Sequence, residues 1–270
     1  MSTETLISLF ALGCYTYAVT ILWPREAPRE ASLESSPEGR ARWLVVLAVA
    51  AHAYVCHAHL FSVDGVRLSL IYVANVTSLV MTIVVLTTAF RLPVSRLFLL
   101  LIPIGMLTLT SLLLIEPGVS PPSDLTRPLL AHIFISLAAY STLMLAACQS
   151  VLLAILDRRL KTPGKQTTHW LPPLETMEQL LVAMLWIGLT LLTASIVSGF
   201  VFLEDMFAQN VAHHIVITSL SWLVYTFFLA GRYFFGWRGL TAVRWTLVAF
   251  ALLVIGYLGS KFVLEYILQR

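Results

Sequence analysis

The sequence predicts an all-α protein, a polytopic membrane helix bundle of about eight transmembrane helices with both termini outside, in the periplasm. Three observations predict this fold class. Of the 270 residues, 59% are hydrophobic and only 11% are charged, whereas soluble domains carry about 25% charged residues. The charged residues are bunched between uncharged runs of about 20 residues, the length that crosses a bilayer. The basic residues also alternate in number from one connection to the next.

Eight apolar runs between charged or Pro-rich breaks give the expected helices. They are residues 6–23, 43–60, 68–90, 97–115, 128–156, 174–203, 211–231 and 245–267. The fifth and sixth are longer than a bilayer needs, so we expect them to tilt or to run past the hydrocarbon. The first run has no preceding basic residue and no small-residue cleavage site, which favours a retained helix over a signal peptide. The connections are too short and polar to bury a core, so residues 1–270 are expected to form a single integral membrane domain.

The orientation follows from the Lys and Arg count on alternate connections, because basic residues concentrate on the cytoplasmic side. The first, third, fifth and seventh connections carry 13 of the 17 Lys and Arg residues, and the other side carries Arg67, Arg127, Lys261 and Arg270. This bias predicts outer termini in an inner, or plasma, membrane.

Ordinary enzymatic chemistry is not expected. The sequence has no P-loop, GxSxG, HExxH or paired-carboxylate motif, and the motifs of nucleic-acid binding are absent as well. The three cysteines, Cys14, Cys56 and Cys148, all fall inside apolar runs. Their number and spacing exclude a disulfide framework, a four-cysteine zinc site and a CxxC redox pair.

Histidine is the functional group that stands out, because six of the seven histidines lie within predicted spans, where an imidazole is costly without a partner. His57 and His59 end the second span, His132 begins the fifth, and His213 and His214 begin the seventh. In the predicted orientation all five lie at one level near the outer face. Three helices that bring imidazoles to one level are what a buried ligand site would need. A histidine at a helix end can equally lie in the interface with its ring in water.

Two kinds of ligand fit these histidines. Haem iron takes two axial imidazoles, one from each side of the ring. A metal ion needs three or four ligands close together, and His52, Cys56 and His59 follow one another at i, i+4 and i+7 on one helix face. Because His52 lies deeper and has no obvious partner outside its own helix, we interpret it as a packed polar residue.

The seventh span carries a polar stripe at helical spacing. His214, Thr218, Ser221 and Tyr225 share one face, with Trp222 beside it, and we expect this face to point into the bundle. His213 shares a different face with apolar residues, which favours His214 as the inward one. Two pairs of small residues, Ser195 with Gly199 and Gly256 with Ser260, predict close helix packing.

Several ordered motifs resemble a known family. They are "HIFISLAAYSTLMLAACQSVLLAILDRRLK" from His132, then "PPLETMEQLL", "IGLTLLTASIVSGFVF", "WLVYTFFLAGRYFFGWRG" and "GYLGSKFVLE", and "VCHAH" around His57. Together they resemble the YpjD and HemX branch of the cytochrome c assembly superfamily, which includes CcsA and CcmC. The likeness is strongest over residues 130–270.

The resemblance implies a polytopic inner-membrane protein that binds haem b through histidines near the outer face and passes it to apocytochrome c or another membrane assembly protein. His132 matches the outer histidine of the family, His57 matches a histidine of the YpjD branch, and His213 and His214 fall near the end of the family's Trp-rich segment. That segment is here "FLEDMFAQNVAHH", without tryptophan, and Ala230 replaces a family histidine.

The sequence therefore supports three hypotheses. The first is a haem-handling protein with His57 and His132 as axial ligands of the iron, His213 or His214 in reserve, and Trp222 and Tyr225 beside the cofactor. The second is a membrane scaffold or accessory subunit of a transporter or assembly complex that keeps the fold without the ligand. The third is a transition-metal binder that uses His52, Cys56 and His59.

Overall fold

The computed structural model describes residues 3–23, 37–62, 65–66, 69–90, 94–115, 126–161, 172–202 and 212–256. Within these ranges the chain is helical apart from short turns and one small hairpin. In the hairpin the two-residue strands β1 (Phe61–Ser62) and β2 (Gly65–Val66) pair antiparallel. The helices are α1 (Thr3–Leu22), α2 (Pro37–Leu60), α3 (Leu70–Ala89), the short η1 (Ser95–Leu97), α4 (Phe98–Leu114), α5 (Arg127–Leu160), α6 (Leu174–Phe202), α7 (Ala212–Phe235) and α8 (Leu240–Val254).

The helices confirm the predicted multi-pass membrane bundle. Among the described residues, α1 to α7 are each long and apolar enough to cross a membrane when η1 is counted with α4 as one segment, Ser95–Leu114, and α8 is a shorter apolar helix. The expected eighth span begins at residue 245, and α8 begins at Leu240, a few residues before it. Arg244 lies in the second turn of the helix with an exposed side chain, where a long basic side chain can extend outward. The predicted continuation beyond Gly256 lies outside the described residues.

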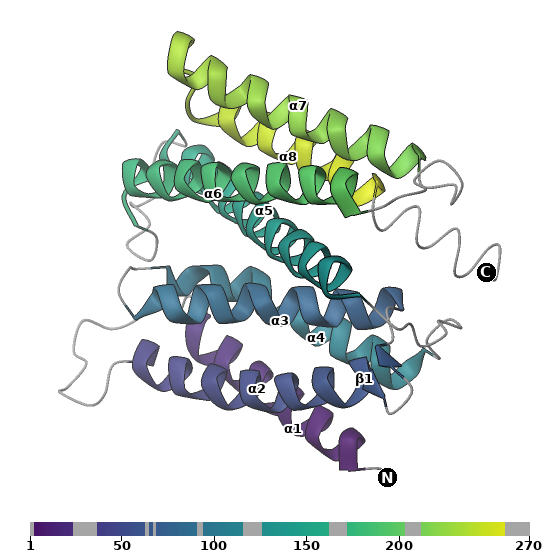
Figure 1. The fold of residues 1–270 in the computed structure, drawn as a ribbon. Helices are drawn as coiled ribbons and strands as arrows, with labels where there is room; N and C mark the ends of the chain where they lie inside the picture. The colour runs from purple at the N-terminus through teal and green to yellow at the C-terminus, as the bar shows by residue number, and fades with distance from the viewer. Residues whose placement is uncertain are drawn as a thin grey trace, which may run out of the picture. The chain divides into compact units, whose positions relative to one another are not determined.

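The helices fall into two compact units, Met1–Ser123 and Asp124–Arg270, which we call unit 1 and unit 2. In unit 1, α1 packs on α2 and α3 packs on α4, with further contacts of α2 with α3 and of α1 with α4 (Figure 1). Arg96 donates to the Leu22 carbonyl at the end of α1 (2.9 Å), and Arg42 to the Ala89 carbonyl at the end of α3 (3.1 Å). These guanidinium groups bond carbonyls that a helix end leaves without an intrahelical donor.

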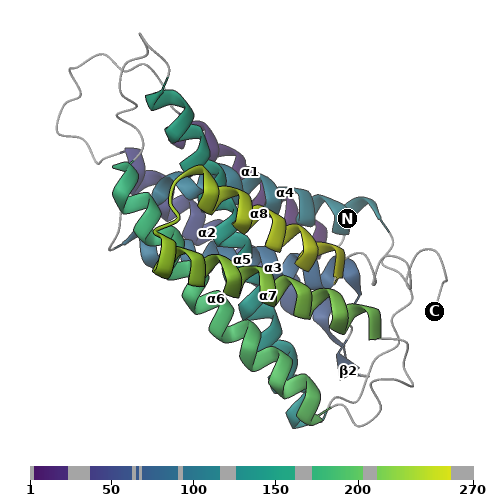
Figure 2. The same cartoon turned by 90° about the horizontal axis from the view of Figure 1, so that it is seen from above.

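Unit 2 is built from the long pair α5 and α6 and from the hairpin of α7 and α8, and α8 also packs on α5. Figure 2 shows α7 and α8 lying side by side along their length. The α5–α6 contact is close at Gly188, where a Cβ would lie 2.5 Å from Leu143 Cδ2. Gly188 thus has the role that we expected of small residues, at a position that the sequence analysis had not selected.

The predictions of a single domain and of outer termini are not tested by these observations and stay predictions.

Candidate functional site

His132 lies in the second turn of α5 and is the centre of a serine cluster between α5 and α6. Its Nδ1 is 2.9 Å from the Ser198 Oγ. Ser198 donates its own hydroxyl proton to the Ser195 carbonyl at 2.9 Å. Because the single hydroxyl proton of Ser198 is directed to that carbonyl, we assign the His132 Nδ1–H as the donor and the Ser198 oxygen as the acceptor.

A second pair of serines, Ser136 and Ser195, lies near the other nitrogen of the His132 ring. Ser136 donates to the His132 carbonyl at 2.7 Å, and its Oγ lies 2.7 Å from the Ser195 Oγ. The Ser136 Oγ is 3.5 Å from His132 Nε2, a marginal distance for a hydrogen bond, and its proton is already directed to the carbonyl. With Nδ1–H assigned as the donor to Ser198, Nε2 is the nitrogen that carries no proton on a neutral ring. A histidine that donates one N–H to a neighbouring oxygen and keeps the other nitrogen basic is in the form that binds a metal.

The two histidines at the end of α2 differ in their surroundings. His59 lies 3.6 Å from the Glu4 carboxylate of α1, measured from Nε2 to Oε2. Its ring also stacks on Tyr72 of α3 at a centroid distance of 5.7 Å. The side chain of His57 is exposed on the same turn. His59 thus ties three helices of unit 1 together, whereas His57 presents its ring at the surface of the unit.

His52 is fully buried, as expected of a packed polar residue, but the expectation that it lacks a partner outside its own helix is wrong. The Tyr15 hydroxyl of α1 is 3.3 Å from His52 Nδ1. The pairing was missed because the two residues are 37 positions apart and helical periodicity relates only residues of one helix. Among the described residues there is no group of three or more His, Cys, Asp or Glu side chains placed to hold a metal ion. The predicted His52, Cys56 and His59 set therefore does not form a metal site.

The polar stripe of α7 points into unit 2, as predicted. Ser221 and Tyr225 are fully buried, and Ser221 donates to the Ala249 carbonyl of α8 at 2.7 Å. The Trp222 indole N–H donates to the Thr193 hydroxyl of α6 at 2.8 Å. His213 and His214 belong to the first turn of α7, and their side chains lie outside what the structure describes.

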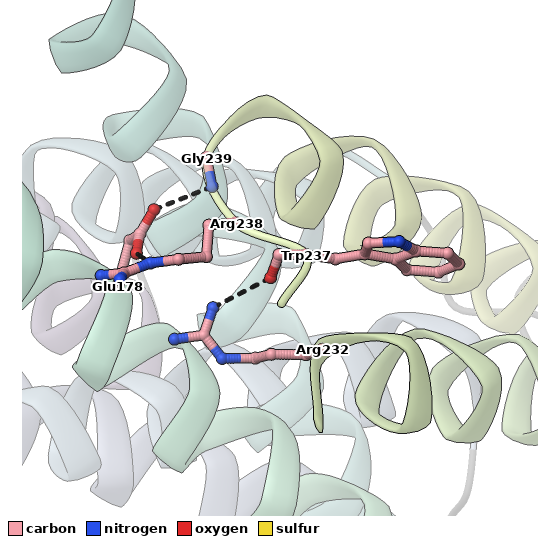
Figure 3. Close-up of polar contacts among 5 residues, drawn as sticks. All are labelled: Glu178, Arg232, Trp237, Arg238 and Gly239. Atoms are coloured by element: carbon pink, nitrogen blue, oxygen red, sulfur yellow. Dashed lines mark hydrogen bonds and ion pairs between the residues drawn. The ribbon is translucent and has the colours of Figure 1, made fainter. Parts of the chain in front are cut away.

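A second polar cluster, at the start of α6 and the α7–α8 turn, was missed by sequence reasoning (Figure 3). The buried Glu178 carboxylate accepts one bond from Arg238 Nε and one from the Gly239 backbone N–H, each at 2.8 Å. Gly239 is the N-cap of α8, with φ of 58°, a conformation that favours glycine. A carboxylate beside a helix N-terminus is stabilised by the helix dipole. Glu178 also raises the pKa of Arg238, first by this hydrogen bond and then by its charge.

The turn is further held by aromatic contacts. Trp237 stacks on Trp245 at 5.8 Å with an angle of 6° between the rings, and Phe227 packs edge-on against both. Arg232 donates to the Trp237 carbonyl at 3.2 Å. A Cβ at Gly231 would lie 2.4 Å from the Trp237 ring, so this glycine makes room for the indole. A glutamate in the second turn of a membrane helix was the sequence signal that could have revealed the cluster.

The comparison with known proteins identifies the family of the chain. A family model described as "Cytochrome C assembly protein" matches residues 43–268, and the chain therefore belongs to the cytochrome c assembly family. It is 28% identical to the inner membrane protein YpjD of Escherichia coli strain K12, over 96% of this chain and 98% of that protein. An uncharacterized 28.8 kDa protein of Azospirillum brasilense is 29% identical over 51% of this chain and 52% of its own length. No solved structure matches the chain.

Proposed function

We propose that this chain is an inner-membrane protein that binds haem b by histidine ligation near the periplasmic face and passes it on in cytochrome c assembly. The observation that carries the proposal is the contact of His132 on α5 with Ser198 on α6, 2.9 Å from Nδ1 to Oγ, from which we assign Nε2 as the basic nitrogen. Membership in the cytochrome c assembly family supports the choice of haem over other cofactors. The printed name of the E. coli relative supports the inner membrane.

The residues present fit the chemistry of haem iron. A neutral imidazole whose other nitrogen donates to an oxygen is the usual form of an axial histidine. His132 of unit 2 and the exposed His57 of unit 1 are the first candidates for the axial ligands, and each is tested by its own variant. His213 and His214 are held in reserve, and Trp222 and Tyr225 are proposed to flank the cofactor. Iron would supply the affinity for these nitrogens, and the protein would fix their orientation, so no catalysed reaction is proposed.

The proposed recipients are apocytochrome c or another membrane assembly protein. The family supports this assembly context, whereas the recipient itself follows only from the resemblance of the motifs.

The test is the absorption spectrum of protein purified from haem-replete cells, oxidised and reduced. We expect a Soret band that weakens in His132→Ala and in His57→Ala. His59→Ala is the matched control, because His59 lies on the same turn as His57, contacts Glu4 and Tyr72, and is not proposed as a haem ligand. A wild-type preparation that stays colourless after haem loading, or equal loss of the band in all three variants, refutes the proposal.

A second candidate function is that of a scaffold or accessory subunit without a ligand. The absence of tryptophan from residues 202–214 favours it, because the matching segment of the family is Trp-rich. In that case the loaded spectrum shows no histidine-dependent band, while the protein still copurifies with a membrane assembly complex.

A further inference from the structure

Helices α7 and α8 of unit 2 carry buried hydroxyl groups that have no hydrogen-bond partner within the described part of the chain. They are the Tyr225 hydroxyl, Thr246 Oγ1 and Thr218 Oγ1. Tyr225 and Thr246 are both completely buried. Buried hydroxyls are almost always bonded to protein or to ordered water, because an unmade bond leaves their desolvation uncompensated.

The three hydroxyls follow one line along the helix pair. Ser221 of α7 donates to the Ala249 carbonyl of α8 and so fixes the register of this antiparallel hairpin. Tyr225 lies about one turn further along α7 and Thr246 about one turn back along α8, which brings the two to the same level. Thr218 lies about one turn before Ser221 on α7. A Cβ at Gly256 would lie 3.6 Å from its Oγ1, so Thr218 also faces α8.

Most other hydroxyls of the described helices avoid this situation by donating to a carbonyl of their own helix. Thr226, the residue after Tyr225, donates to the Trp222 carbonyl at 2.9 Å. Thr193 of α6 donates to the Leu189 carbonyl at 2.8 Å. Thr218 and Thr246 have the same option, since each lies inside a helix, yet they do not use it. Their hydroxyls therefore stay without a hydrogen-bond partner among the described residues.

We propose that the line Thr218, Ser221, Tyr225 and Thr246 is a site for bound water within unit 2. Water is the smallest molecule that both donates and accepts, and a buried water needs two to four polar partners. The hydroxyls of Tyr225 and Thr246 at one level, and the accepting oxygen of Ser221 about one turn away, supply them. The stripe reaches the first turn of α7, where His214 lies. This inference concerns the hydration of unit 2 and does not depend on haem binding.

X-ray hydroxyl-radical footprinting with mass spectrometry, on the whole protein in nanodiscs, tests the proposal, because radicals form from the water beside a side chain. Phe228 is the internal control, since it lies three residues from Tyr225 on α7 and is equally buried, at 0% exposure. We expect Tyr225 to be labelled several-fold faster than Phe228. Equal protection of the two rings overturns the proposal.

Thr246→Val supplies a second readout, since valine keeps the shape of threonine and removes its hydroxyl. We expect slower labelling of Tyr225 and a lower midpoint of unfolding, because the bound water loses one partner. Thr241→Val is the matched control, on the same helix at an exposed position, and should change neither. A Thr246→Val protein that unfolds at a higher midpoint, with unchanged Tyr225 labelling, shows that the hydroxyl binds nothing and overturns the proposal.

Discussion

The close contact of α5 and α6 at Gly188 gives the sharpest prediction. In Gly188→Ala the new methyl carbon would lie 2.5 Å from Leu143 Cδ2 and 2.8 Å from Leu143 Cγ, whereas carbon atoms pack at about 3.5–4.0 Å. Leu143 is completely buried, so the side chain must shift by about 1 Å or the helices must separate. Overpacking of this kind costs about 1–3 kcal/mol. The higher helix propensity of alanine returns about 1 kcal/mol, which leaves a net destabilisation of about 0–2 kcal/mol.

The chain offers a matched control in Gly13, which lies inside α1 and has no atom within 4 Å of a built Cβ. Gly13→Ala should gain only the propensity difference, so the two variants should differ by about 1–3 kcal/mol in the free energy of unfolding. Reversible unfolding by SDS in mixed micelles measures this difference. Leu143→Ala should cost less in the Gly188→Ala protein than in the wild type, because the methyl fills the space. If Gly188→Ala is as stable as Gly13→Ala, the close contact is refuted.

The other predictions concern the two polar clusters. Ser198→Ala removes the acceptor of His132 Nδ1–H and should weaken haem binding about 10- to 100-fold in a titration. Ser150→Ala changes a buried serine bonded within its own helix and should leave the haem affinity unchanged. Equal haem affinities of the two variants contradict the assigned tautomer. Glu178→Gln should lower the free energy of unfolding by about 1 kcal/mol, counting only the weakened capping of the α8 N-terminus. An unchanged midpoint of unfolding in SDS contradicts this capping role. The methyl group of Gly231→Ala forces the Trp237 ring away from Trp245 and should reduce the near-UV circular dichroism. An unaltered spectrum shows that the protein accommodates the methyl group without losing the stacking of the two indoles.

The sequence predicted the membrane helices well because a single physical rule determines them. A chain segment that crosses lipid must be apolar and must satisfy its own backbone, so the apolar runs and the helices coincide. The same rule predicted the inward face of α7, since Ser221 and Tyr225 could only be tolerated inside. It does not fix where a helix begins, since Arg244 lies inside α8 and a charge near a helix end can extend out of the apolar region.

The contacts between helices could not be predicted from the sequence. The Tyr15–His52 pair and the bonds of Glu178 to Arg238 and Gly239 join residues 37 to 61 positions apart. No periodicity relates such residues, and their proximity depends on how whole helices pack. The serine partners of His132 were missed for the same reason. Ser195 was selected only as a small residue that allows close packing, and its hydroxyl proves to be part of the histidine cluster.

Polar side chains that bond across helices are the strongest pointers to function in this fold. Thr16, Thr77, Thr82, Thr142 and Thr190 each donate to the carbonyl four residues earlier, which satisfies the hydroxyl locally and says nothing about a site. Ser198 also donates within its own helix, yet its oxygen accepts from His132 on the neighbouring helix. The Ser198 hydroxyl already has a hydrogen-bond partner in its own helix, so its hydrogen bonding does not require the contact with His132. An imidazole among membrane helices is costly without a partner, and under the proposed function the contact with Ser198 also orients the His132 ring, which the Ser198→Ala variant tests.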